Sequence, residues 1–185
     1  PWTAFERKAG TEPPPDTSPD DLALMDSTSG TPASPKGVRH SGNSFLSTMR
    51  QAIQWQGEVE SNLTPYPSGH VAGALLLMRH AVAGQMSVGF DVWNPALAAS
   101  EIARLKIRAT SGTPFHYRTL LDAAEVSGSD LSSLRECGTG GATVPEGLIE
   151  RAEALGMRMV RRYGMSEHPT VSSGRPEDDF EQRMT

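Results

Sequence analysis

The stretch Asp26-Ser27-Thr28-Ser29-Gly30-Thr31-Pro32-Ala33-Ser34-Pro35-Lys36-Gly37-Val38-Arg39-His40 is the most informative part of the chain. Hydroxyl side chains cluster in it, and its small residues leave backbone N–H groups accessible. Lys36, Arg39 and His40 add positive charge within a few residues. Dipoles, hydroxyl groups and a mobile cation are what a loop needs to hold a polyphosphate. Composition alone, however, favours a flexible polar surface loop.

Outward from this loop, segments with the patterns of strands and helices alternate. Short apolar runs predict a buried strand over Leu22–Met25 and strands over 86–90, 106–109 and 157–160, with another inside 130–137. The run 62–67 is flanked by prolines and is assigned no element. Apolar spacing or a leading proline predicts helices over 45–53, over 71–82, and after Pro95, Pro114 and Pro145, with Gly156 ending the last.

This alternation predicts an α/β domain with a largely parallel sheet over residues 21–185. Residues 1–20 are rich in proline and acidic residues, which predicts a linker or extended arm. In open α/β sheets, ligands bind outside the carboxyl ends of the strands. The loops Ser27–Gly37, Gly138–Ala142 and Gly164–Ser166 each follow a predicted strand, so we expect them to face one crevice.

Composition narrows the classes of function. The 185 residues are 37% apolar and 21% charged, which is typical of a globular protein, and the net charge of −5 argues against a nucleic-acid-binding surface. The longest apolar run is too short for a transmembrane helix. The single cysteine, Cys137, excludes an internal disulfide and fits a cytoplasmic protein. We expect Cys137 to be a buried filler rather than a nucleophile. The sequence carries no signal of oligomeric state.

The order of residues in the first loop is more specific than its composition. A Walker A motif would need glycine before the lysine and Ser or Thr after it, and neither is present. The string instead resembles the signature Thr-Ser-Gly-Thr-Thr-Gly-any-Pro-Lys-Gly of the adenylate-forming enzymes, which include acyl-CoA synthetases, luciferases and peptide-synthetase adenylation domains. The matching positions are Thr28, Ser29, Gly30, Thr31, Pro35, Lys36 and Gly37. Pro32 and Ala33 depart from it, and Pro32 lacks an N–H that could bind phosphate.

Three further blocks resemble motifs of the same family, in the family order. Pro67-Ser68-Gly69-His70-Val71-Ala72-Gly73 is similar to Pro-x-x-His-x-x-Gly, Gly138–Pro145 to Gly-Gly-Ala-Pro-Leu-Pro, and Tyr163-Gly164-Met165-Ser166-Glu167 to Tyr-Gly-x-Thr-Glu. The segments 111–115 and 173–178 look most like those of ligases for medium-chain or alicyclic acids, such as cyclohexanecarboxylate–CoA ligase. Considered alone, His70 would more often be a helix-start residue, and the glycines a strand-to-helix turn.

The resemblance implies part of the large N-terminal domain of an AMP-forming acyl-CoA ligase. It implies ATP, Mg²⁺, a small carboxylic acid and coenzyme A as ligands. It also implies Lys36, His70 and Glu167 as catalytic residues, and Glu167 and Thr28 as metal ligands. The residues implied for nucleotide binding are Thr28, Ser29, Gly30, Thr31, Lys36, Gly140, Gly141, Ala142, Tyr163, Gly164, Met165 and Ser166.

Two alternatives remain open at this point. Pro32, Ala33 and the family's N-terminal portion and small C-terminal domain, which we expect to be missing here, would also fit a nucleotide-binding module that is incomplete or inactive as a catalyst. A peptide-synthetase type of adenylation domain would use the same first half-reaction.

Overall fold

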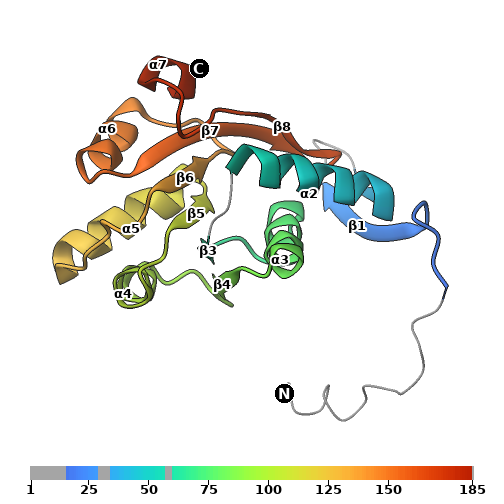
Figure 1. Ribbon diagram of the computed structural model, residues 1–185, viewed down its shortest axis with the longest axis horizontal. Helices are drawn as coiled ribbons and strands as arrows, with labels where there is room; N and C mark the ends of the chain where they lie inside the picture. Colours follow the sequence, from blue (N-terminus) through green and yellow to red (C-terminus); the bar gives the residue numbers. More distant parts are fainter. Residues whose placement is uncertain (1–15, 29–33, 57–59, 185) are drawn as a thin grey trace, which may run out of the picture.

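The computed structural model describes residues 16–28, 34–56 and 60–184 (Figure 1). Its main body is a six-stranded sheet of order β4-β3-β5-β6-β7-β8. In chain order the strands are β3 Ser61–Thr64, β4 Met86–Gly89, β5 Ala109–Gly112, β6 Glu136–Thr139, β7 Arg158–Met165 and β8 His168–Ser173. All neighbouring strands are parallel except β7 and β8. The predicted α/β class with a largely parallel sheet is confirmed.

Helices cover both faces of this sheet. They are α2 Gly42–Gln56, α3 Val71–Ala83, α4 Pro95–Leu105, α5 Pro114–Ser127, α6 Glu146–Ala154 and the short α7 Phe180–Met184. In Figure 1, α2 and α3 lie on one side of the sheet and α4, α5 and α6 on the other. The larger apolar core lies beneath α4, α5 and α6, and a smaller cluster joins α2 to α3 through Phe45, Met49, Val71 and Leu75.

The helix boundaries follow from local sequence. The Asn94 side chain accepts the Leu97 N–H at 3.0 Å, and Pro95 occupies the first turn of α4. Gly84 and Gly128 end α3 and α5 in the left-handed conformation. Pro145 lies at the N-cap of α6, and Gly156, at φ 77°, follows its last turn as predicted.

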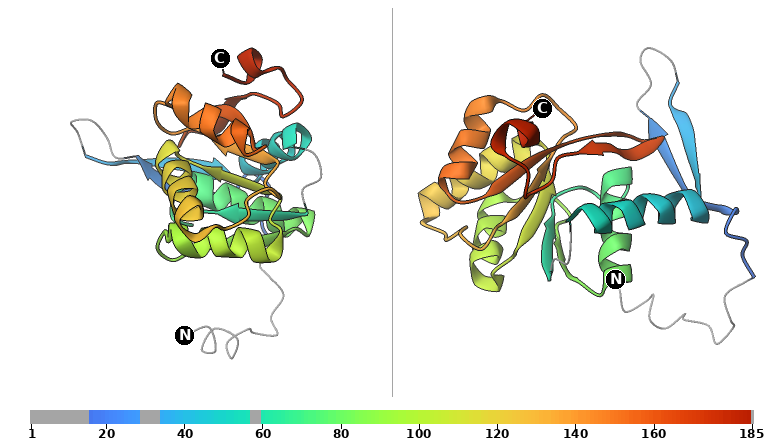
Figure 2. Two further views of the ribbon diagram at one scale, coloured as in Figure 1. Left: turned by 90° about the vertical axis from the view of Figure 1, so that its left-hand side faces the viewer. Right: turned by 45° about the horizontal axis from the view of Figure 1, so that its top comes forward.

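The strand predicted over Leu22–Met25 exists, but its predicted burial is wrong. Strand β1, Leu22–Thr28, pairs antiparallel with β2, Lys36–Ser41, as a two-stranded hairpin outside the main sheet (Figure 2). Leu22 and Met25 are 50% and 65% exposed, so the described parts of the chain do not cover both faces of this hairpin. Strand β2 itself was not predicted, since it falls where the sequence indicates a polar loop.

Four other parts of the sheet differ from the prediction. Strand β6 runs over Glu136–Thr139 and overlaps only the end of the segment 130–137 in which the sequence predicts a strand. Strand β3 was not predicted because Asn62 and Thr64 interrupt its apolar pattern, although all four of its residues are buried. Strand β5 begins at Ala109, where the sequence predicts an end, because Lys106 is the C-cap of α4. Strand β7 runs on through Gly164 to Met165 and turns into the unpredicted β8, so that Gly164–Ser166 is the end of a hairpin strand and its turn.

Of the predicted arm at residues 1–20, only 16–20 lie within the described residues, and they are exposed. The Pro19 carbonyl accepts the Asn43 N–H at 2.8 Å, and Asp20 accepts a hydrogen bond from the Asn43 amide. These contacts attach residues 19 and 20 to the start of α2. No helix among the described residues is long and apolar enough to cross a membrane.

Candidate functional site

A cavity of about 360 Å³ opens at the carboxyl ends of the parallel strands. The chain runs from β3 to β4 on one side of β3 and then crosses to β5 on the other side. The cavity lies at this change of direction. Open α/β sheets bind ligands at such a point. The wall includes residues that follow β3, β5 and β6, residues from the end of β7, and the first two turns of α3: Tyr66, His70, Leu76, Thr113, Gly140 and Tyr163 among them.

His70 lies at this cavity as the N-cap of α3. Its ring Nδ1 accepts a hydrogen bond from the Ala72 backbone N–H at 3.1 Å. The backbone N–H of His70 donates to the Pro67 carbonyl at 3.1 Å. Its ring stacks on Tyr66, with 6.1 Å between the ring centroids. The helix-start interpretation is therefore correct, and the same position puts the imidazole on the cavity wall.

Gly73 explains the spacing of the Pro-x-x-His-x-x-Gly block. A Cβ atom on Gly73 would lie 2.0 Å from the Pro67 carbonyl oxygen, which is far inside contact distance. That oxygen also accepts the His70 N–H, so the turn before α3 closes only over a residue without a side chain. The glycine holds His70 in place through the backbone.

Replacing Gly73 by alanine is expected to lower the free energy of unfolding by about 2 kcal/mol, because backbone must move to make room for the methyl group. Gly69→Ala is the matched control, since a Cβ there meets nothing within 4 Å. Chemical denaturation of both variants measures the difference. Equal midpoints for the two variants would contradict this account of the block.

The Gly138–Ala142 segment forms the second wall of the cavity. A Cβ on Gly140 would lie 2.2 Å from the Arg162 carbonyl oxygen, so this glycine lets the segment after β6 lie directly against β7. Gly141 has φ 77°, where L-residues are strained. Gly140 also lines a second cavity of about 440 Å³, together with Ala142 and Tyr163, so the segment separates two hollows.

Residues 163–167 form the end of β7 and the turn into β8. Tyr163 is 58% exposed and lines both cavities, which leaves a ring face free for a planar ligand. Gly164, Met165 and Ser166 line the first cavity, whereas Glu167 lies exposed in the turn. Two of the three predicted loops therefore share one cavity.

The β1–β2 hairpin reaches this turn through Asp26 and His40, of which sequence analysis noted only the positive charge of His40. The Ser166 hydroxyl donates to the Asp26 carboxylate at 2.8 Å, and His40 Nε2 donates to the Ser166 carbonyl at 2.7 Å. Asp26 and His40 are both buried. They lie 140 and 126 positions from Ser166, and no local sequence pattern reports such a contact.

The third predicted loop begins and ends at the far end of the same hairpin. Thr28 pairs with Lys36 in register, and the Thr28 hydroxyl donates to the Lys36 carbonyl at 3.5 Å. Lys36 is exposed, and neither residue lines the cavity. Ser29, Gly30 and Thr31, with Pro32 and Ala33, lie outside the described residues.

The donor set available to Mg²⁺ matches the way this ion binds next to phosphates. Among the described residues no three His, Cys, Asp or Glu side chains gather into a metal site. Mg²⁺ in phosphate chemistry usually takes one or two protein oxygens and completes its shell with water and phosphate. The exposed Glu167 carboxylate and the Thr28 hydroxyl are oxygens of that kind, so their chemistry fits the ion, while the Thr28 hydroxyl is bonded to the Lys36 carbonyl in this structure.

Arg162 is a further residue of the cavity that sequence analysis did not select. Its Nη1 donates to the Ser111 hydroxyl at 2.8 Å and its Nε to the Ser173 hydroxyl at 3.3 Å. Gly138 makes room for it, because a Cβ there would lie 2.5 Å from the guanidinium. Burial lowers the pKa of Arg162 from its usual range. Arg162 lies two residues beyond the strand predicted over 157–160, so the sequence carries no signal of its role.

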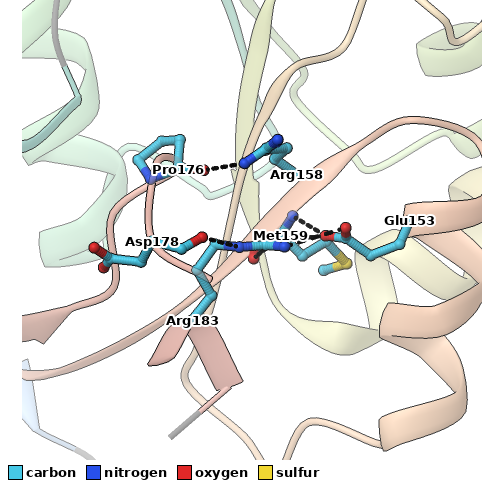
Figure 3. Close-up of polar contacts among 6 residues, drawn as sticks. All are labelled: Glu153, Arg158, Met159, Pro176, Asp178 and Arg183. Atoms are coloured by element: carbon cyan, nitrogen blue, oxygen red, sulfur yellow. Dashed lines mark hydrogen bonds and ion pairs between the residues drawn. The ribbon is translucent and has the colours of Figure 1, made fainter. Parts of the chain in front are cut away.

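Arg183 lines the second cavity and forms an ion pair with Glu153, in which the arginine is buried and the glutamate part-buried (Figure 3). Arg183 Nη1 donates to Glu153 at 2.6 Å and to the Met159 carbonyl at 2.9 Å, and its Nε donates to the Asp178 carbonyl at 3.1 Å. Arg158 adds a bond to the Pro176 carbonyl at 2.9 Å. These contacts, drawn together in Figure 3, attach the segment after β8 to β7 and α6.

Cys137 is fully buried in β6, as expected of a filler. Burial raises the pKa of its thiol to about 12. A buried thiol with a raised pKa forms little thiolate near neutral pH, which argues against a nucleophilic role and for that of a core residue.

Comparison with known proteins decides the family. The model of the family described as AMP-binding enzyme matches residues 2–184. The chain belongs to the AMP-binding enzyme family. It is 31% identical over 178 residues to the medium-chain fatty-acid–CoA ligase of Escherichia coli (strain K12), covering 89% of this chain and 30% of that protein. It is 30% identical to a probable 2-succinylbenzoate–CoA ligase of Mycobacterium tuberculosis, covering 80% of this chain and 40% of that protein.

Solved structures of similar proteins have the same fold. The luciferase-like enzyme of the mealworm Zophobas morio superimposes with a TM-score of 0.82 at 27% identity, over 91% of this chain and 40% of that one. The N-terminal domain of FACL13 from Mycobacterium tuberculosis superimposes with a TM-score of 0.80 at 25% identity, over 89% and 42%. The chain thus spans about a third of the length of the curated relatives it matches.

Proposed function

We propose that this chain supplies the nucleotide- and acid-binding part of an AMP-forming acyl-CoA ligase. The observation that carries the proposal is the cavity at the direction change of the sheet, whose walls are the family blocks around His70, Gly140 and Tyr163. The family match and the acyl-CoA ligases among its relatives support the same activity. A cytoplasmic location is part of this proposal.

The proposed reaction has two steps. A carboxylate oxygen of the acid attacks the α-phosphorus of ATP, and the bond from that phosphorus to pyrophosphate breaks. The sulfur of coenzyme A then attacks the acyl carbon, its proton passes to solvent, and AMP leaves with the bonding electrons. Phosphoryl transfer of this kind depends on positioning and charge neutralisation more than on covalent catalysis.

The residues of the cavity divide between the two substrates in this proposal. The backbone of Gly140 to Ala142 and the exposed face of Tyr163 hold the adenine, while Gly164 and Met165 shape the site beside it. His70 and the apolar side of α3, with Leu75 and Leu76, border the acyl chain.

The remaining residues act on the phosphates. The Ser166 hydroxyl binds the α-phosphate by giving up its bond to Asp26. Lys36, together with Ser29 to Thr31, holds the β- and γ-phosphates. Glu167 and Thr28 would hold Mg²⁺, which neutralises charge that develops on the phosphate oxygens.

Acid-dependent release of pyrophosphate tests this function. The full-length protein that includes this chain is mixed with ATP, Mg²⁺ and either octanoate or octanedioate, and pyrophosphate is measured with and without the acid. We expect release only when an acid is present, followed by the acyl-CoA when coenzyme A is added. Nucleotide binding without acid-dependent release would contradict the ligase activity and would leave a nucleotide-binding module.

A further inference from the structure

One face of the main sheet is polar, and strand register shows which residues share it. Asn62 pairs with Ser87 on β4 and with Ala109 on β5, and Ala109 pairs with Glu136 on β6. Paired residues and every second residue along a strand point to the same side. The face therefore carries the side chains of Asn62, Thr64, Ser87, Ser111, Glu136 and Arg162.

This polar face is the one covered by α3. The Ser87 hydroxyl lies 2.9 Å from His80 Nδ1, which is on that helix. The opposite face carries Leu63, Cys137 and Met159 and packs into the apolar core beneath α4, α5 and α6. The two faces of one sheet thus differ sharply, and the polar one is enclosed rather than open to solvent.

Several buried polar atoms between α3 and the sheet have no partner in the part of the chain that the structure describes. Arg79, on α3, is 1% exposed, and its Nε and Nη2 make no hydrogen bond. Asn62 is fully buried with both amide atoms unpaired. Glu136 Oε2, Thr64 Oγ1 and His80 Nε2 are unpaired as well. Buried polar groups are normally satisfied, so unpaired ones indicate a place for a polar ligand or for water.

The charge of this polar layer is positive. Burial and the nearby Arg162 lower the pKa of Arg79 to about 10, so Arg79 stays cationic at neutral pH. Burial, with a smaller effect of Arg79, lowers the pKa of His80 to about 4, so His80 is neutral. Glu136 is the acidic side chain that interacts with both arginines, and burial raises its pKa. Two guanidinium groups thus face one carboxyl group.

The polar layer begins where the acid-binding cavity ends. Leu75 and Leu76 line the cavity, and Arg79 follows one helical turn, about 5.4 Å, further along α3. On the sheet, Ser111 and Gly138 line the cavity, and Glu136 lies two residues before Gly138 on the same face. The Arg162 guanidinium occupies the space that Gly138 leaves beside the sheet, so Arg162 lies between the cavity and the polar layer.

We propose that the layer beneath α3 is the inner end of the acid-binding cavity and selects acids of medium length that carry a second carboxylate. This inference rests on the proposed function, and it narrows the substrate to dicarboxylic acids. One carboxylate is presented at the carboxyl ends of the strands, and the other pairs with Arg79 and the Asn62 amide. An acid with a methyl terminus would instead leave these groups buried and unpaired, which costs binding energy.

The test compares acids of equal length in direct binding. The unmodified protein and its Arg79→Met variant are titrated by calorimetry with octanoate, octanedioate, decanoate and decanedioate, in the absence of nucleotide. We expect the unmodified protein to bind one of the diacids about tenfold or more tightly than the monoacid of the same length. Arg79→Met should remove that preference, while Arg79→Lys should keep part of it.

The control variant is Arg104→Met, which removes an exposed arginine on the opposite side of the sheet and should leave the preference intact. Removing an unpaired buried charge should not destabilise the fold, and thermal unfolding of each variant checks this. Equal binding of monoacid and diacid by the unmodified protein would overturn the inference, as would a preference that survives in a folded Arg79→Met. A parallel titration with AMP keeps the two proposals apart, because absence of AMP binding bears on the proposed function alone.

Discussion

Replacing Arg183 with methionine is expected to lower the free energy of unfolding by about 3 kcal/mol. The substitution keeps most of the aliphatic length but removes bonds to Glu153, Met159 and Asp178. Glu153 then stays partly buried, with the Met159 N–H as its remaining donor. Loss of one partner of a buried pair costs more than the pair contributes, because the other charge is left unpaired.

The measurement is urea denaturation of Arg183→Met beside Arg175→Met, an exposed arginine in the same segment. The control should unfold at the same urea concentration as the unmodified protein. If Arg183→Met also unfolded at that urea concentration, the Arg183 contacts drawn in Figure 3 would not hold the segment after β8 in place.

The contribution of the Arg183–Glu153 ion pair to the free energy of unfolding should depend on pH. Burial alone would raise the pKa of Glu153, but hydrogen bonds from Arg183 and the Met159 N–H outweigh it and lower the pKa. A carboxyl group with a lower pKa in the folded state stabilises the fold fully above its unfolded pKa, and that stability is lost as the pH falls through the folded pKa. The difference between the unmodified protein and Arg183→Met should therefore shrink in acid.

The largest expected effect on activity is that of Lys36→Ala. In the full-length protein we expect it to slow acid-dependent pyrophosphate release by about 100- to 1000-fold, as removal of a preorganised electrostatic contact to a developing charge does elsewhere. Arg39→Ala is the matched control, because it removes an exposed positive charge three residues further along the same strand. Initial rates at saturating ATP measure both. A rate unchanged in Lys36→Ala, or slowed equally in Arg39→Ala, would contradict a specific role for Lys36.

The elements predicted correctly from sequence are those whose apolar pattern reports their environment. Helices α4 and α5 begin at Pro95 and Pro114, and one face of each is apolar, so both start and type are visible. Strand β3 was missed because its alternate residues face the polar layer rather than a second apolar layer. A central strand of this kind lacks the continuous apolar run that usually marks a buried parallel strand.

The candidate site divides in the same way. His70, Gly140 and Tyr163 stand in short ordered blocks, and the structure places all three on one cavity. Three other residues reach the same region through hydrogen bonds to partners that are 51 to 140 positions away in the sequence: Asp26, His40 and Arg162. Such contacts depend on how β1, β2 and β7 meet, and residue type alone does not encode that.

Titration of the purified protein with ATP and Mg²⁺ by calorimetry tests the central claim, recognition of an adenine nucleotide beside the Gly140 segment and Tyr163. We predict saturable binding that is weakened in Tyr163→Ala and unchanged in Val126→Ala, which trims an exposed side chain on α5. Absence of binding, or binding that Tyr163→Ala leaves unchanged, would contradict the claim.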